Sequence, residues 1–302
     1  MNRPRSSVFA CLTLLALAFA VHSVRAAGPT DVVDVIKRSF KVERGGTLYL
    51  DVDQGDIEVL TRRGSEVIIE VELTVDVSDR AAAKRALESY RPDFTQRGPD
   101  VHFMSRYDQS SGIWGRLKDA TRLKVHVTAR VPEEYNVNFT TGFGSVEVSD
   151  LKGEVRGRTG AGQIKLGVIT GQVDVSTGTG NVEIAGAHSS LLIKTGAGNV
   201  DARNVRKTSN IHTGAGNIEV QITGQPEFPS QIATGAGNVT VYVGRGIGLD
   251  VQASTAMGSA VTDFPLTVES KFMRKAFYGE VNGGGPHLQL RAGVGSVQLK
   301  KR

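Results

Sequence analysis

The chain has little cysteine, few aromatic residues and, beyond its first residues, no apolar run long enough to cross a membrane. Its one cysteine, Cys11, lies inside the N-terminal apolar run. The rest of the chain can therefore have no disulfide, cysteine nucleophile or cysteine-ligated metal, and its stability must come from packing and strand hydrogen bonds. Aromatic residues make up only 6% of the sequence, which fits a narrow core of branched aliphatic side chains.

The N-terminus has the pattern of a secretory signal peptide at residues 1–26. Arg3 and Arg5 precede an apolar run from Val8 to Val21, and small residues surround a predicted cleavage site after Ala26. We therefore expect an exported protein of the periplasm, the extracellular space or the cell surface, with no membrane span after signal removal. The removed segment carries three arginines and no acidic residue, so the formal charge of +5 falls to +2.

A small net charge gives weak support for a nucleic-acid partner, and we expect none. Nucleic-acid binding favours a clustered basic face with interleaved aromatic residues. The nearest pattern in this chain is Arg106, Arg116, Lys118, Arg122 and Lys124 beside Tyr107 and Trp114. We interpret it as a solvated loop and strand edge.

A five-residue unit, Gly-x-Val/Ile/Leu-x-apolar, returns every nine residues, and every second return follows Thr-Gly. A short fixed period with glycine corners is typical of a β-solenoid. The Thr-Gly-x-Gly corners recur at every eighteenth and later at every twenty-first residue, starting at Thr141, Thr159, Thr177, Thr195, Thr213 and Thr234, with a degraded copy at Thr255. The sequence thus predicts an all-β fold: a parallel β-solenoid with about 18 residues and two strands per coil.

Alternation within each unit predicts which side chains fill the core. Three six-residue faces per coil would give the same total, but residues at that step include Lys152 and Arg158, which cannot form an apolar column. A step of eighteen gives coherent apolar columns. They are Val146, Ile164, Val182, Val200 and Ile218; Val148, Leu166, Ile184, Ala202 and Val220; Leu151, Ile169, Ala187 and Val205; Val155, Val173, Leu191 and Ser209; and Gly157, Val175, Ile193 and Ile211.

The repeat begins before the main array, at Gly46 and Gly55, so the array is interrupted rather than started late. We predict one domain at 28–302, with a helix-bearing insertion or cap at 71–130, a main array at 141–262 and C-terminal coils at 264–302. Strands are expected in and beside the insertion, at 66–77, 101–105 and 122–131, and a short helix within it from Arg80 to Tyr90. The Lys300-Lys301-Arg302 ending is expected to protect the final strand edge.

The sequence resembles a family of exported bacterial β-strand-repeat proteins named putative adhesins, related to the head domains of auto-transporter adhesins. The likeness rests on Gly55-Asp-Ile-Glu-Val59, on Val131-Pro132 leading into the first Thr-Gly-x-Gly, on the run of repeats and on Gly279 to Gly285. The resemblance implies a solenoid at the cell envelope. It brings no catalytic or binding residues.

No residue pattern predicts a catalytic, cofactor-binding or metal site, and no cofactor is expected. Calcium-binding rolls need Asp two places after glycine, where this chain has Val146 and its aliphatic equivalents. Glu183, Asp201 and Glu219 fall in one outward column, which we interpret as a hydrated face with local counter-charges, weak binding of a divalent cation being the alternative. The histidines His102, His126, His188, His212 and His287 show no metal-ligand spacing.

These patterns favour a non-enzymatic, adhesin-like or cell-envelope interaction surface that binds an unknown protein or glycan. One alternative is a carbohydrate-active β-helix enzyme, which would need carboxylates converging on a groove. The other is a structural or signalling scaffold in envelope homeostasis, which self-associates through the solenoid ends.

Overall fold

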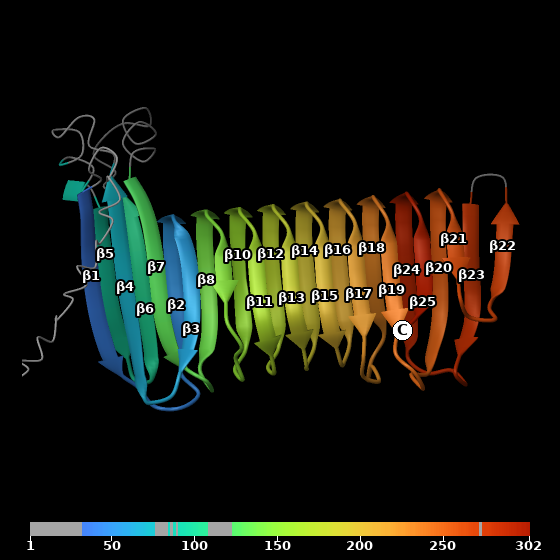
Figure 1. The fold of residues 1–302 in the computed structure, drawn as a ribbon, viewed down its shortest axis with the longest axis horizontal. Helices are drawn as coiled ribbons and strands as arrows, with labels where there is room; N and C mark the ends of the chain where they lie inside the picture. Colours follow the sequence, from blue (N-terminus) through green and yellow to red (C-terminus); the bar gives the residue numbers. More distant parts are fainter. Residues whose placement is uncertain (1–31, 76–83, 85–86, 89, 108–122, 272–273) are drawn as a thin grey trace, which may run out of the picture.

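The computed structural model describes residues 32–75, 84, 87–88, 90–107, 123–271 and 274–302. These residues form two long sheets whose strands lie side by side along the longest axis of the molecule (Figure 1). The predicted signal peptide lies outside them. Within the described part of the chain, no helix has the length and hydrophobicity needed to cross a membrane.

The first sheet, called sheet A below, has 12 strands. In spatial order they are β1 (Val32–Lys41), β4 (Glu66–Val75), β7 (Leu123–Pro132), β3 (Asp56–Arg62), β9 (Val146–Val148), β11 (Ile164–Ile169), β13 (Val182–Ala187), β15 (Val200–Val205), β17 (Ile218–Ile222), β19 (Val239–Val243), β25 (Val297–Lys301) and β21 (Ala260–Thr262).

The second sheet, called sheet B, has 13 strands. In spatial order they are β22 (Thr267–Lys271), β23 (Arg274–Val281), β20 (Leu249–Met257), β24 (His287–Val294), β18 (Ser230–Ala236), β16 (Ser209–Ala215), β14 (Leu191–Ala197), β12 (Val173–Thr179), β10 (Val155–Ala161), β8 (Asn136–Phe143), β2 (Thr47–Gln54), β6 (Asp100–Tyr107) and β5 (Tyr90–Arg97).

The chain alternates between the sheets, so one strand of each sheet and two corners make a coil. Neighbouring coils pair in parallel and in register, with Val155 opposite Val173 and Ile164 opposite Val182, which is the eighteen-residue step of the sequence repeat. The all-β prediction is therefore confirmed. Val146, Ile164, Val182, Val200 and Ile218 are each at most 1% exposed, as the predicted core columns require.

Gly157 stands in one of these inward columns although glycine buries no side chain. A Cβ atom at this position would lie 2.5 Å from the ring of Phe139 on the neighbouring strand. Phe139 is itself fully buried, so its ring fills the space that a larger residue 157 would occupy.

The threonine and asparagine columns hold the corners together. Thr177 donates its hydroxyl to the carbonyl of Gly162 at 3.1 Å, and Thr195 does the same to Gly180 at 3.3 Å. Asn181, Asn199, Asn217 and Asn238, each directly after a corner glycine, link neighbouring coils through bonds between main chain and side chain. The backbone N–H of Asn217 donates to Oδ1 of Asn199 at 2.8 Å, so each coil's main chain binds the side chain of the coil before it.

The N-terminal coil stacks directly on the main array, since Leu48 pairs with Val137 and Ile57 with Val146. The prediction of an interrupted array is confirmed. Five further strands extend the sheets beyond the N-terminal coil: β7, β4 and β1 in sheet A, and β6 and β5 in sheet B. We call these five strands the N-terminal cap.

The predicted helix at 80–90 lies mostly outside the described residues, where only Lys84, Leu87 and Glu88 have helical backbone. Its predicted end is wrong, because Tyr90 begins strand β5. Pro92 lies within this strand, opposite Ser105. β5 is at the edge of sheet B, where a proline costs no ladder hydrogen bond.

The order of the last coils differs from the sequence prediction. The coil of β24 and β25 lies between the coil of β18 and β19 and the coil of β20 and β21. Lys300 and Lys301 therefore do not protect a final edge, since β25 pairs with β19 on one side and with β21 on the other. After β19 the chain leaves one coil position empty and forms the next coil from β20 and β21. Its C-terminal strands β24 and β25 then occupy the empty position.

Candidate functional site

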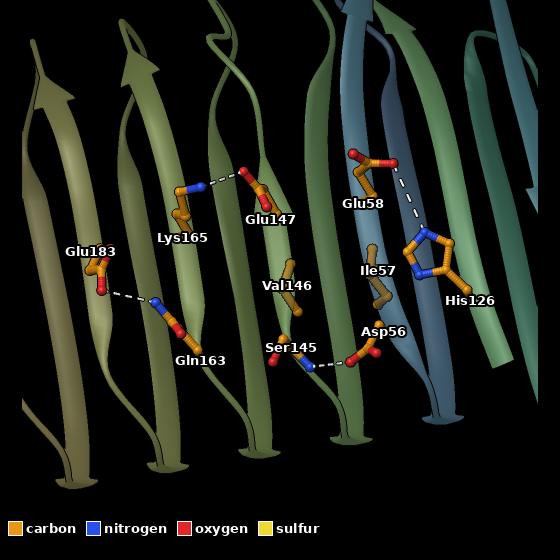
Figure 2. A pocket seen from close by; sticks show the side chains of 10 residues that line it. All are labelled: Asp56, Ile57, Glu58, His126, Ser145, Val146, Glu147, Gln163, Lys165 and Glu183. Carbon is orange, nitrogen blue, oxygen red and sulfur yellow. Dashed lines mark hydrogen bonds and ion pairs between the residues drawn. The ribbon is translucent and has the colours of Figure 1, made fainter. Parts of the chain in front are cut away.

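The outer face of sheet A has a groove of about 490 Å³ that extends from β7 of the N-terminal cap across the N-terminal coil to the first coils of the main array. Strands β3, β7, β9, β11 and β13, with the residues just before β9 and β11, supply its lining (Figure 2). The groove is lined by Asp56, Ile57, Glu58, His126, Ser145, Val146, Glu147, Gln163, Lys165 and Glu183.

Strand register places most of its charged side chains in one straight row. Glu58 pairs with Glu147, Glu147 with Lys165, and Lys165 with Glu183. The row continues beyond the groove through Asp201 and Glu219. We call these six residues the charged column: Glu58, Glu147, Lys165, Glu183, Asp201 and Glu219.

Local structure explains why this row faces outward. Each of its members lies between two buried residues of its strand, for example Glu147 between Val146 and Val148. Successive side chains of a strand point to opposite faces of the sheet. The aliphatic core columns thus fix the charged column on the outer surface, at strand spacings of about 4.8 Å.

Hydrogen bonds join neighbouring strands inside the groove (Figure 2). Lys165 Nζ lies 2.8 Å from Glu147 Oε1, and Gln163 Nε2 donates to Glu183 Oε1 at 2.9 Å. On the cap side, His126 Nε2 lies 3.9 Å from Glu58 Oε2.

Asp56 also lines the groove, and a backbone hydrogen bond holds its carboxylate. The backbone N–H of Ser145 donates to its Oδ1 atom at 2.8 Å (Figure 2).

Counter-charges reduce the repulsion between adjacent carboxylates of the column. The hydrogen bond and charge of Glu147 raise the pKa of Lys165, which keeps this amine protonated. Farther along, Arg203 contacts Asp201 at 2.7 Å, and the pKa of Arg203 is raised first by Asp201 and further by Glu219 and Glu183. The interpretation of Glu183, Asp201 and Glu219 as a hydrated face with local counter-charges agrees with these contacts.

In the described residues, no group of three or more His, Cys, Asp or Glu side chains is arranged to hold a metal ion. Glu183, Asp201 and Glu219 therefore form no such group. The groove instead presents four carboxylates, Asp56, Glu58, Glu147 and Glu183, beside one amine. Carboxylates of this kind accept hydrogen bonds from ammonium, guanidinium and hydroxyl groups. The arrangement suits a ligand rich in such donors.

Some of this site could have been found in the sequence. Glu147 precedes Lys165 by the same eighteen-residue step that separates Lys165 from Glu183. Glu58 and His126 have no such signal, because Glu58 pairs with a residue far along the chain and His126 reaches the groove through the cap.

The other histidines do not join the groove. The ring of His102 stacks on Tyr49 at 4.5 Å on sheet B. Partial burial and the charge of Arg206 lower the pKa of His188.

The basic pattern near residues 106–124 does not form one patch in the described part. Arg106 lies near the end of β6 in sheet B and contacts Asp51 at 3.4 Å, whereas Lys124 lies on β7 in sheet A. Arg116, Lys118, Arg122 and Trp114 lie outside the described residues.

Comparison with known proteins identifies the family. A family model described as Toastrack DUF4097 matches residues 108–300, more than half of the chain. The chain belongs to the Toastrack DUF4097 family. The resemblance to a bacterial adhesin-like family of β-strand-repeat proteins is thereby confirmed. No curated protein matches this Toastrack chain.

The solved structures similar to the Toastrack chain include three that share 8 to 13% identity with it. A putative adhesin from Bacteroides fragilis is 13% identical with a TM-score of 0.42, and the match covers 89% of this chain and 97% of that one. Two proteins from Parabacteroides distasonis match over the same shares, a putative adhesin (8% identity, TM-score 0.32) and a putative lipid binding protein (9%, 0.31). Likeness at this level does not bear on function.

Proposed function

We propose that this Toastrack protein is an exported, non-enzymatic β-solenoid that acts as an adhesin-like interaction surface at the cell envelope. Its partner is a protein or glycan rich in hydrogen-bond donors, which lies along the groove and the charged column. The observation that carries this proposal is the in-register row from Glu58 to Glu219, held at fixed spacing by the core columns beneath it.

A rigid row of side chains suits repeated contacts with an extended ligand. The strands under it pair in register, so the row requires little ordering when a partner binds. The N-terminal segment supports export, and delivery to the periplasm or cell surface would bring the row into contact with envelope glycans and proteins.

A matched pair of triple variants tests this function. E58Q/E147Q/E183Q removes three groove carboxylates while keeping their size. D51N/D174N/D250N removes three carboxylates from sheet B and serves as the control. Binding to an array of envelope glycans, and crosslinking in the envelope of the producing cell, should fall at least about tenfold for the first variant and stay unchanged for the control. Equal binding by both variants contradicts the proposal.

A carbohydrate-active enzyme is the second candidate, because four carboxylates line one groove. Glycoside hydrolysis commonly uses two carboxyl groups on opposite sides of the scissile bond. Release of reducing ends from envelope polysaccharides, measured with the wild-type chain and with E147Q and E183Q, separates the two. Saturable turnover that either substitution abolishes establishes the enzyme and overturns a purely binding role.

A further inference from the structure

The C-terminal end of the molecule is stepped. Sheet A ends at β21, whereas sheet B continues beyond β20 with two more strands, β23 and β22 (Figure 1). The corner at Gly258 joins β20 to β21, so these two strands belong to one coil. Sheet A is therefore two strands shorter than sheet B at this end, and we call the step beside β21 the recess and the strands β23 and β22 the overhang.

The overhang exposes apolar surface on its inner side. Val268 of β22 pairs with Phe277 of β23, and directly opposed residues of antiparallel strands point to the same face. Phe277 is fully buried, but Val268 is 60% exposed. On the other side of the recess, Ala260 and Thr262 of β21 are half-buried, although they pair with the fully buried Val297 and Leu299.

Both strands at this end also have a free edge. In the described residues, β21 pairs only with β25, and β22 only with β23. An unpaired edge presents backbone N–H and C=O groups that bind an additional strand. The edges of β21 and β22 therefore lack backbone partners, and the inward Val268 lacks apolar cover, and a strand from another chain supplies both.

The N-terminal end is protected against such pairing. On the edge strand β1, Asp34 and Arg38 pair with the buried Leu73 and Ile69 and thus carry charge on the inner face. Inward-pointing charges of this kind block strand addition. β1 and β5 together contain five basic and two acidic residues, so two copies of this end repel each other.

We propose that two copies of the chain associate through their C-terminal ends as a two-fold dimer. The β22–β23 overhang of each copy fills the sheet A recess of the other, and β22 pairs antiparallel with the partner copy's β21. A two-fold axis parallel to the strands brings sheet B of each copy into line with sheet A of the other. The two-strand overhang of each copy then meets the two-strand recess of its partner. Such a self-complementary contact closes after two copies.

The charge of this end permits the contact. The sequence from Asp263 to Val281 contains three acidic and three basic residues, so two copies meet without net repulsion. The size of the contact predicts a weak dimer. Two strands of five to eight residues, at about 4.8 Å by 3.3 Å per residue, cover about 160 to 250 Å². Each copy buries this area once on its overhang and once in its recess, on the order of 300 to 500 Å² in all, which is less than the roughly 800 Å² per partner of a standard interface.

Sedimentation velocity on the full chain, from about 1 μM to about 1 mM, tests the dimer. The wild-type mass should rise toward that of two copies, and V268D should weaken association at least about tenfold. V294D and V35D are matched controls, since Val294 and Val35 are 50% and 51% exposed at a corner and at the N-terminal end. Both should associate as the wild type does, and thermal melts should show all three variants folded.

A chemical crosslink provides a second readout. In a chain with Cys11→Ser, a short bismaleimide should link V268C into a covalent dimer and leave V294C monomeric. A wild-type chain that stays monomeric throughout the concentration range overturns the proposal. A V268D chain that associates as the wild type does also overturns it. A V35D chain that fails to associate overturns it as well, because this result places the contact at the N-terminal end.

Discussion

The backbone N–H of Asn199 donates a 2.9 Å hydrogen bond to Oδ1 of Asn181, the equivalent residue of the preceding coil. The Oδ1 atom of Asn199 accepts the same bond from Asn217 at 2.8 Å. Each asparagine therefore joins its own coil to both neighbours. The bond begins where a corner ends, so the asparagines fix the point at which each sheet A strand enters the ladder.

Substitution of a mid-array asparagine should destabilise the array. Asn199→Ala leaves the N–H of Asn217 without its side-chain acceptor, and water replaces it only in part. We expect a loss of about 1 kcal/mol in the free energy of unfolding, measured by urea denaturation. The exposed corner substitution Ser190→Ala is the control and should change stability by less than about 0.5 kcal/mol. Equal losses would show that the asparagine bond contributes nothing specific.

The corner glycines are required by close approach between coils. A Cβ atom at residue 198 would lie 2.0 Å from the carbonyl oxygen of Gly180, a backbone atom that cannot move without breaking the ladder. Gly198→Ala should cost more than about 3 kcal/mol of stability or prevent folding, as judged by circular dichroism and thermal melting.

Ala197→Thr is the matched control for this corner. Residue 197 is exposed and pairs with Thr179, which already carries this side chain. The control should melt within a few degrees of the wild type. A Gly198→Ala chain as stable as Ala197→Thr would contradict the stacked-corner geometry.

A charge in a core column should be far more damaging than a change beside it. Val182 is fully buried, so Val182→Asp places an unpaired carboxylate in the centre of the core, and cooperative unfolding should be lost. Glu183→Gln changes the outward neighbour and keeps an acceptor for Gln163, so its melt should match the wild type. Identical thermal melts of the two variants would refute the assignment of the columns.

High pH should destabilise the N-terminal cap. Burial raises the pKa of Tyr90 to about 12, although a hydrogen bond from Ser105 opposes the shift. The unfolded chain ionises this phenol near pH 10 while the folded chain keeps it neutral, so stability is unaffected below pH 10 and falls between pH 10 and 12. The loss attributable to Tyr90 should reach about 2 kcal/mol.

Tyr90→Phe removes this contribution and should flatten the decline in denaturation midpoint from pH 10 to 12. Tyr242→Phe, on the outer face of β19, is the control and should retain the wild-type decline. If Tyr90→Phe declines as steeply as the control, another group is responsible for the alkaline loss.

The sequence predicts the repeating part of this fold because its period is the physical period of the ladder. Val182 and Val200 are separated by one eighteen-residue step, and the structure places them opposite each other on neighbouring strands. Alternation of buried and exposed residues then decides which side chains face the core and which form the charged column. Thus the outward position of Glu183 and Asp201 is readable from their aliphatic neighbours.

The order of coils is not readable in the same way. Val239, Val297 and Ala260 occupy equivalent inward positions, and each could stack on the others. The column pattern is the same whichever coil comes next, so the sequence gives no reason to place β25 between β19 and β21. The place of Glu58 in the groove is likewise not predictable from the repeat, because its coil pairs with residues far along the chain.

Cysteine pairs across neighbouring strands measure the eighteen-residue register most directly. In a chain with Cys11→Ser, E183C/D201C places two thiols on directly paired residues of β13 and β15, where about 5 Å separates their Cα atoms. E183C/E219C places them two strands apart, beyond the reach of a disulfide. Mild oxidation followed by thiol titration should show a disulfide in the first chain and free thiols in the second. Free thiols in E183C/D201C, or a disulfide within single chains of E183C/E219C, would contradict the register on which the core, the groove and the charged column depend.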